Sequence, residues 1–150
     1  MNRQQKKIVL NFIFVIAFTL ISVIAMIHLK DWVNRSEATR AMTQLSQAVH
    51  DYRSAYKSVP PESYIQSILD TLEGRARVSN FNYRARWIDF ESRCDAILAF
   101  IEQDYHTFIF KKTILILKLD GTVEWIDKSD FQTLYQQQQT PLEKQEASRK

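Results

Sequence analysis

The stretch from Ile8 to Leu29 reads IVLNFIFVIAFTLISVIAMIHL and contains no charged residue. About 22 residues at roughly 1.5 Å per residue give a helix of about 33 Å, which matches a hydrocarbon core of about 30 Å. Thr19 and Ser22 can bond back to the helix, and His28 lies at the end of the stretch, so these polar groups are compatible with lipid. The stretch predicts a single transmembrane helix around which the rest of the chain is organised.

The charged residues that flank this stretch predict its orientation. The segment 1–7 is basic and holds no acidic residue, whereas the basic residues after the stretch are accompanied by Asp31 and Glu37. The positive-inside rule therefore places the amino terminus in the cytoplasm. Everything from Lys30 onward is expected on the other side of the membrane.

A cleaved signal peptide is the alternative interpretation of the same stretch. The small residues around Val23–Ala25 could serve a signal peptidase. The apolar run continues to Leu29, however, and is longer than the roughly 7 to 15 residues of a usual signal-peptide core. An uncleaved anchor is therefore the preferred prediction.

Length and charge limit what the remaining chain can do. Segment 30–135 leaves roughly 105 residues, which is enough for one small domain with its own core. The net charge of +3 comes partly from the two chain ends, so the domain itself is nearly neutral and gives little reason to expect nucleic acid as a partner. Cys94 is the only cysteine, which excludes an intrachain disulfide. We expect it to be buried as a small apolar residue, with an intermolecular bridge as the alternative.

Helical patterns follow the anchor directly. No Gly or Pro occurs from Lys30 to Val59, and apolar side chains recur at spacings of three and four at Met42, Leu45, Val49, Tyr52 and Tyr56. The pattern predicts that the anchor helix continues to about Lys57 and ends before Pro60–Pro61. Packing of its apolar face on a sheet of the same chain is preferred over a short coiled coil. A second helix is expected from Pro61 to Gly74.

The segment Val78–Phe90 alternates between apolar and polar residues. Phe81, Tyr83, Ala85 and Trp87 fall on one face and arginines on the other, which predicts a strand with one buried face. Arginines interleaved with aromatic residues could also form a platform for single-stranded nucleic acid. The arginines concerned are Arg75, Arg77, Arg84, Arg86 and Arg93. Because the two residue types fall on opposite faces, a core face and a solvated face are the preferred interpretation.

The last third predicts a hairpin, a helix and a tail. Ala96–Ile101 and Thr113–Leu119 are apolar runs typical of buried strands, and Asp120–Gly121 predicts a two-residue turn into a strand at Val123–Ile126. Ser129 or Asp130 can cap a final helix, and Ser129 is spaced to form a capping box with Gln132. The apolar side of this helix holds Phe131, Leu134 and Tyr135. Segment 136–150 is poor in apolar residues and is expected to be disordered.

Residue patterns that carry chemistry are scarce. The histidines His28, His50 and His106 show no metal-ligand spacing, and Gly74 and Gly121 are too few for a phosphate-binding loop. The acidic residues Glu91, Asp95, Glu102 and Asp104 near His106 form a weak candidate for a calcium loop. We therefore predict no catalytic residue, no cofactor site and no metal site, and expect that the protein is not an enzyme.

Three features together resemble type IV pilins and the pseudopilins of type II secretion. These are Phe18-Thr19-Leu20-Ile21 in the anchor, the continuing helix LSQAVHDYRSAY at 45–56, and the strand-rich segment after Pro60–Pro61. The last third, with AILAF at 96–100, His106 and ILILKLDGTVEWIDKSDFQTLY at 114–135, resembles prepilin-like proteins common in planctomycete-type bacteria. In those proteins a histidine precedes an Asp-Gly hairpin.

The chain departs from the prepilin pattern at the anchor. Prepilins are cut after a Gly that precedes Phe-Thr-Leu-Ile-Glu, whereas Ala17 and Ser22 occupy the corresponding positions here. Apolar sequence also lies ahead of Phe18. The resemblance therefore predicts fold and topology rather than processing by a prepilin peptidase.

Taken with the resemblance, the sequence predicts an α+β protein with four parts. Segment 1–7 is the cytoplasmic start, 8–29 the transmembrane helix, 30–135 a pilin-like head with an antiparallel sheet, and 136–150 the tail. The resemblance implies a bacterial inner-membrane protein with an extracytoplasmic head. Its expected partners are the lipid bilayer and pilin-like subunits, including copies of itself, or an inner-membrane secretion platform. An anchored sensor or scaffold head that binds a ligand or an envelope protein is the alternative.

Overall fold

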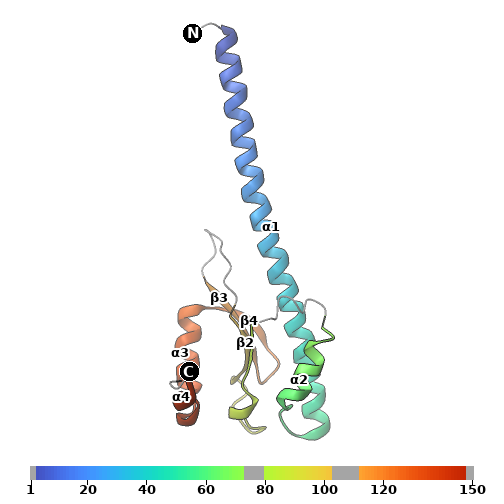
Figure 1. Ribbon diagram of the computed structural model, residues 1–150. Helices are drawn as coiled ribbons and strands as arrows, with labels where there is room; N and C mark the ends of the chain where they lie inside the picture. Colours follow the sequence, from blue (N-terminus) through green and yellow to red (C-terminus); the bar gives the residue numbers. More distant parts are fainter. Residues whose placement is uncertain (1–2, 73–79, 103–111, 148–150) are drawn as a thin grey trace. The chain divides into compact units, whose positions relative to one another are not determined.

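A computed structural model of the chain describes residues 3–72, 80–102 and 112–147. It divides into two compact units, Met1–Asn34 and Arg35–Lys150. Helix α1 (Arg3–Tyr56) contributes to both units (Figure 1). The uninterrupted helix follows from the absence of Gly and Pro before Pro60.

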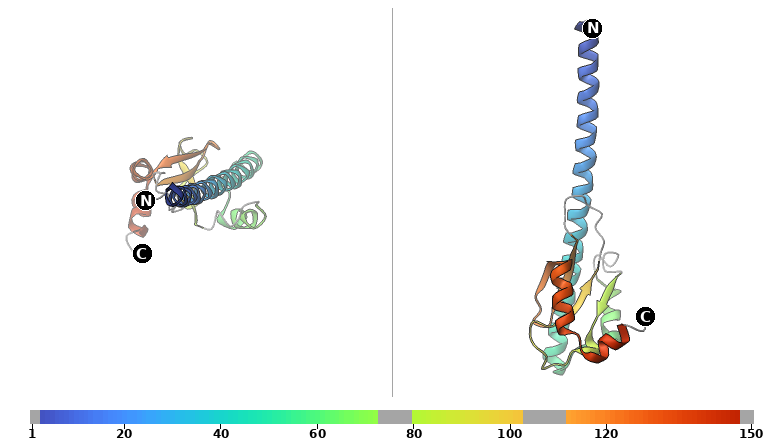
Figure 2. Two further views of the ribbon diagram at one scale, coloured as in Figure 1. Left: turned by 90° about the horizontal axis from the view of Figure 1, so that it is seen from above. Right: turned by 90° about the vertical axis from the view of Figure 1, so that its left-hand side faces the viewer.

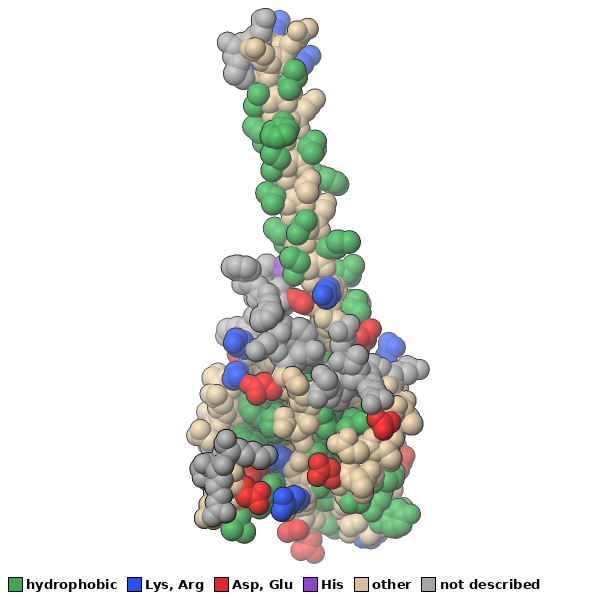
Figure 3. All heavy atoms as spheres, viewed as in Figure 1, with side chains coloured by type: hydrophobic (Ala, Val, Ile, Leu, Met, Phe, Trp, Pro, Cys, Tyr) green, Lys and Arg blue, Asp and Glu red, His purple; other side chains and the backbone are tan. Residues whose placement is uncertain are grey.

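The first unit is the amino-terminal part of α1, and its apolar side chains are exposed. Phe14 is 72% and Met26 is 75% exposed, and Figure 3 shows such side chains along this part of the helix. The hydroxyls of Thr19 and Ser22 donate to the carbonyl oxygens of Val15 and Phe18, at 2.8 and 2.9 Å, as predicted. By length and composition this helix is a candidate membrane span.

The second unit is a three-layer head built on one antiparallel sheet. The strands are β1 (Phe81–Tyr83), β2 (Ile97–Ile101), β3 (Thr113–Lys118) and β4 (Val123–Asp127), in the order β1-β2-β3-β4. Residues 35–56 of α1 and helix α2 (Glu62–Leu69) cover one face, and α3 (Lys128–Gln138) covers the other (Figures 1 and 2). The remaining elements are the 3₁₀ helix η2 (Ala85–Trp87) and α4 (Pro141–Ala147). The prediction of an α+β chain with a small antiparallel sheet is confirmed.

The apolar face of α1 forms the larger part of the core. Its fully buried side chains are Ala38, Ala41, Met42 and Leu45, which pack with Leu115 and Leu117 of β3. Two polar contacts connect the same layers: the indole nitrogen of Trp125 donates to Thr39 Oγ1 at 2.9 Å, and Ser46 Oγ donates to the carbonyl of Gly121 at 2.8 Å. The predicted packing of this helix on a sheet is confirmed.

A β-bulge decides which residues of β2 face α3. The pairing with β3 shifts between Ile97 and Ala99, so Ile97 and Phe100 reach the same face although they are three residues apart. On that face Phe100 packs against Phe131 of α3, with ring centroids 4.8 Å apart. Strict alternation along β2 does not describe this strand.

The Asp120–Gly121 hairpin is confirmed, but its loop is longer than predicted. Lys118 N donates to Thr122 O at 2.9 Å and Gly121 N donates to Lys118 O at 3.0 Å, which leaves three residues, 119–121, in the loop. Gly121 has a φ of +92°, whereas Asp120 is not in the positive-φ region that a two-residue Asp-Gly turn needs. A three-residue loop that ends in a left-handed glycine is the result.

The predicted strand over Val78–Phe90 is wrong beyond Tyr83. After β1 the backbone turns at Arg84, with φ −109° and ψ 20°, into η2, so the alternation ends there. Residues 78 and 79 lie outside the described residues.

Two predicted helix boundaries also differ from the structure. The second helix begins at Glu62, with Pro61 as its N-cap, and ends at Leu69. The predicted end at Gly74 lies outside the described residues. The predicted caps at Ser129 or Asp130 are wrong, because α3 begins at Lys128 with Asp127 as N-cap, two residues before Ser129.

The expectations that Cys94 is buried and that the tail is disordered also fail. Cys94 is exposed, because it lies in the turns between η2 and β2 rather than in a strand. The tail predicted at 136–150 is helical over most of its described length, since α3 continues to Gln138 and α4 covers 141–147. The physical reason is a long-range ion pair made by Glu143, described below.

The hairpin gives a direct test of the head. Replacing Gly121 with Val forces a β-branched residue to φ +92°, and its Cβ meets Ser46 Oγ at 3.1 Å. We expect a loss of about 1–3 kcal/mol in the free energy of unfolding. Chemical denaturation of the full chain in detergent measures it, with Thr122→Val at the exposed neighbouring position as control. Equal midpoints for Gly121→Val and wild type would contradict the turn geometry.

Candidate functional site

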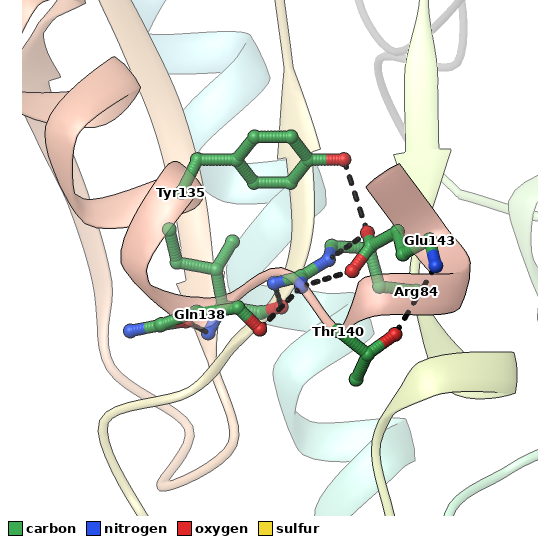
Figure 4. A network of polar contacts seen from close by, with 6 residues as sticks. Arg84, Tyr135, Gln138, Thr140 and Glu143 are labelled. Atoms are coloured by element: carbon green, nitrogen blue, oxygen red, sulfur yellow. Dashed lines mark hydrogen bonds and ion pairs between the residues drawn. The ribbon is translucent and has the colours of Figure 1, made fainter. Parts of the chain in front are cut away.

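A buried ion pair joins the start of η2 to the carboxyl-terminal helix. Arg84 and Glu143 have side chains only 4% and 7% exposed. Arg84 Nε donates to Glu143 Oε1 at 2.9 Å and Nη2 donates to Oε2 at 2.8 Å, which is the two-pronged geometry of a strong charge-assisted contact (Figure 4). These two residues are 59 positions apart in the chain.

The backbone turn after β1 positions Arg84. Its amide donates to the carbonyl of Leu98 at 2.9 Å, which fixes the residue beside the bulge of β2. Its Nη1 donates to the carbonyl of Ile97 at 2.9 Å and Nη2 to that of Gln138 at 3.3 Å. The guanidinium also lies 4.7 Å from the ring centroid of Tyr135. The head therefore provides the Arg84 guanidinium with two carbonyl acceptors and an aromatic ring in addition to the Glu143 carboxylate.

The cap of α4 positions Glu143. Its amide donates to Thr140 Oγ1 at 3.2 Å, and Pro141 occupies the first position of the helix. The hydroxyl of Tyr135 donates to Glu143 Oε1 at 3.1 Å. Burial is the largest cause that raises the pKa of the Tyr135 hydroxyl, and the nearby Glu143 carboxylate adds to it. Tyr135 is therefore a neutral donor to this carboxylate at ordinary pH.

Two open cavities adjoin the ion pair, and Arg84 lines both. One has a volume of about 260 Å³ and is lined by four polar side chains, Arg84 and Glu143 among them, and by four aromatic ones: Tyr83, Trp87, Phe100 and Tyr135. The other, of about 330 Å³, shares Arg84 and Trp87 and is otherwise lined mostly by polar residues. The chemistry of this site is recognition of a carboxylate by a buried guanidinium beside aromatic surfaces.

The structure separates the arginines of the suggested nucleic-acid platform. Arg84 is buried in the ion pair, whereas the prediction placed it on the solvated face. Arg86 lies 3.7 Å from Glu146, and Arg93 pairs with Asp95 at 2.8 Å. Arg75 and Arg77 are outside the described residues. The three described arginines are thus each engaged with a carboxylate of the chain.

The acidic residues of the weak calcium hypothesis are also engaged separately. Asp95 accepts from Arg93, and this hydrogen bond is the main cause that lowers the pKa of Asp95. Glu102 pairs with Lys128, and Glu91 is exposed. Asp104 and His106 lie outside the described residues. Within the described ranges, no group of three or more metal-ligating side chains comes together.

Sequence reasoning missed the ion pair but had a signal for the helix that carries it. Thr140-Pro141-Leu142-Glu143 has a capping residue, a proline at the first helical position and a glutamate at the third, which is a helix-start pattern. Low apolar content outweighed that pattern in the disorder prediction. No local pattern could have joined Glu143 to Arg84, because the contact is made only when the sheet forms.

Comparison with protein-family models, curated proteins and solved structures finds no match to this chain. What the fold defines is a class: an α+β chain with a candidate membrane span and a small four-stranded antiparallel head.

The ion pair makes a prediction about stability. Glu143→Gln leaves the buried Arg84 guanidinium uncompensated and should cost about 3–5 kcal/mol, whereas Glu146→Gln, in the exposed pair with Arg86, should cost about 0–1 kcal/mol. Chemical denaturation of the two variants measures the difference. The double variant Arg84→Met/Glu143→Leu should recover most of the loss, because it removes both charges. Equal effects of the two single variants would contradict the buried pairing.

Proposed function

We propose that the chain is a single-pass, membrane-anchored structural protein with a pilin-like head, a subunit or accessory of a type II secretion or type IV pilus-like assembly. It acts by assembly rather than by catalysis. The proposed location is the bacterial inner membrane, with segment 1–7 in the cytoplasm and the head outside it. The observation that carries the proposal is the continuity of α1 from an uncharged apolar segment into the helix that packs on the sheet.

The apolar segment supports membrane anchoring. Ile8–Leu29 has no charged residue, and its most apolar window is not buried within the structure. Leaving large side chains such as Phe12 and Phe18, which are 66% and 67% exposed, in water is unfavourable by roughly 25 cal/mol per Å² of apolar surface. A bilayer removes that cost and matches the length of the segment. A secretory signal sequence is the competing explanation for the same features.

The architecture of the head supports the pilin-like interpretation. The second half of α1 forms one layer, and the sheet it covers is an antiparallel meander. This arrangement agrees with the resemblance carried by the anchor and the Asp-Gly hairpin. In such an arrangement a single helix links the membrane segment to the core of the head.

Small residues in the anchor support contact between subunits. Ala17 and Ala25 are eight positions apart, which places them about 80° apart around the helix, and Ser22 lies about 60° beyond Ala25. Small side chains let transmembrane helices approach closely. The proposed partners are therefore pilin-like neighbours, including copies of this chain, and the inner-membrane platform that gathers them.

An anchored sensor or scaffold head is the second candidate. The observation that favours it is the pair of cavities, of about 260 and 330 Å³, that adjoin Arg84. Such a head would bind a carboxylate-bearing ligand or an envelope protein without forming a filament. Partner capture through the anchor separates the two candidates.

The first prediction of this proposal is that Ile8–Leu29 stays in the mature protein. The expected result is an intact chain that floats with membranes, because the apolar run passes through the possible cleavage site at Val23–Ala25. Intact-mass spectrometry of the membrane-extracted protein measures it. A mature chain that begins at Met26 would show that the segment is a signal peptide.

The second prediction concerns assembly through the anchor. Single cysteines at Ala17 or Ala25, with Cys94 replaced by Ser, should crosslink to pilin-like neighbours or to other copies in the native membrane. Phe12→Cys, about 140° around the same helix from both Ala17 and Ala25, is the matched control and should capture less. Absence of any protein partner at Ala17 and Ala25, together with binding of a soluble ligand by the head, would favour the sensor interpretation.

A further inference from the structure

The carboxyl-terminal helix is joined to the head through a short connection. On the head side, Gln138 is fixed to β2, because its side chain accepts from Ile97 N at 2.8 Å and donates to the carbonyl of Asp95 at 3.1 Å. Gln139 then adopts extended backbone, with φ −69° and ψ 132°. The chain is therefore held firmly up to residue 138.

On the other side of the connection, Thr140 already belongs to α4. Its hydroxyl oxygen accepts from Glu143 N at 3.2 Å, and its carbonyl accepts from Lys144 N at 3.1 Å. The N-cap of α4 therefore lies within segment 140–147 and does not depend on contact with the rest of the head. Gln139, whose amide donates to the carbonyl of Tyr135 at 3.0 Å, is the one residue between these two held segments.

Glu143 is the buried side chain through which α4 is attached, and Glu146 adds an exposed contact with Arg86 at 3.7 Å. Glu143 is 6% exposed, whereas Leu142, the large apolar residue of this helix, is 66% exposed. The other described side chains of the helix are exposed as well. The helix is held by charge and hydrogen bonds rather than by burial of apolar surface.

The head, in contrast, needs a carboxylate at this place. Arg84 is 4% exposed, and its contacts with the carbonyls of Ile97 and Gln138 leave its charge uncompensated. A buried guanidinium without a counter-ion is strongly destabilising. The site must therefore be filled, but nothing in its chemistry requires that the carboxylate come from the same copy of the chain.

We propose that α4 is exchanged between neighbouring copies of this chain, so that Glu143 of one copy pairs with Arg84 of another. Every contact of the closed form is then remade between two copies, which is the reason that exchange of an identical element is inexpensive. Confinement of anchored copies to one membrane plane raises their effective concentration and favours the exchange; this step rests on the proposed function. The surface around Arg84 is thus an interface whose partner is a second copy.

Crosslinking of two differently tagged full-length chains in mixed vesicles tests the proposal. Both carry Cys94→Ser; one also carries Arg86→Cys and the other Glu146→Cys. These positions are suitable because Arg86 Nη1 and Glu146 Oε2 lie 3.7 Å apart and both side chains are exposed, at 73% and 54%. The vesicles contain phosphatidylethanolamine and phosphatidylglycerol, and the reagent is a short bis-maleimide.

The expected result is a crosslinked dimer that holds both tags. Adding Glu143→Gln to the chain with Glu146→Cys should lower its yield by about tenfold or more, because the buried charge loses its partner. Leu142→Gln, at the exposed position beside it, is the matched control and should leave the yield unchanged. No mixed dimer, while a chain with both cysteine substitutions crosslinks internally, would overturn the proposal. So would a mixed dimer that Glu143→Gln leaves undiminished.

A second pair of variants tests the exchange even if Glu143→Gln prevents folding. Arg84→Glu and Glu143→Arg each place like charges together in a closed chain, but the two chains complement each other when α4 is exchanged. Mixing them should raise the thermal midpoint above that of either alone, and an unchanged midpoint would overturn the exchange. Flotation of the same vesicles separates the two proposals: chains that float but do not exchange contradict the exchange alone, whereas chains that fail to float contradict the anchor.

Discussion

The packing of α1 on the sheet is the interaction on which the head depends. Ala38 and Ala41 have small side chains, so the helix can lie close to β3 while Met42 and Leu45 fill the space between them. Because all four are fully buried, truncating Met42 or Leu45 would leave a cavity at the centre of the unit. The hairpin loop and the edge strand β4 are tied to the same helix through Ser46 and Thr39. One helix thus organises both the core and the turn.

Patterns of apolar residues predicted the elements whose burial is local and regular. The period of the α1 face, the runs at Ala96–Ile101 and Thr113–Leu119, and the Asp120–Gly121 hairpin each express a single rule of local geometry. The errors occur where a distant contact overrides such a rule. Alternation up to Trp87 predicted a long strand, but the backbone turns at Arg84 so that its guanidinium can reach Glu143.

The candidate site could not be predicted for the same reason. Arginine between aromatic residues is typical of a solvated strand face, and a polar carboxyl-terminal segment is typical of a disordered tail. Each interpretation follows the local sequence of its segment. In the folded head, however, the charge of Arg84 in one segment is neutralised by Glu143 in the other. The helix-start pattern at Thr140–Glu143 was the one local signal, and it predicts the helix without predicting where it docks.

The account rests on the proposal that one helix serves both membrane and head, and accessibility along Ile8–Leu29 tests it most directly. Nitroxide labels placed singly through the segment, in Cys94→Ser chains reconstituted in vesicles, report collision with oxygen and with a water-soluble nickel chelate. The account predicts that oxygen access is highest and chelate access lowest around Phe18 and Thr19, at the middle of the span. Free access of the chelate to those central positions would contradict it.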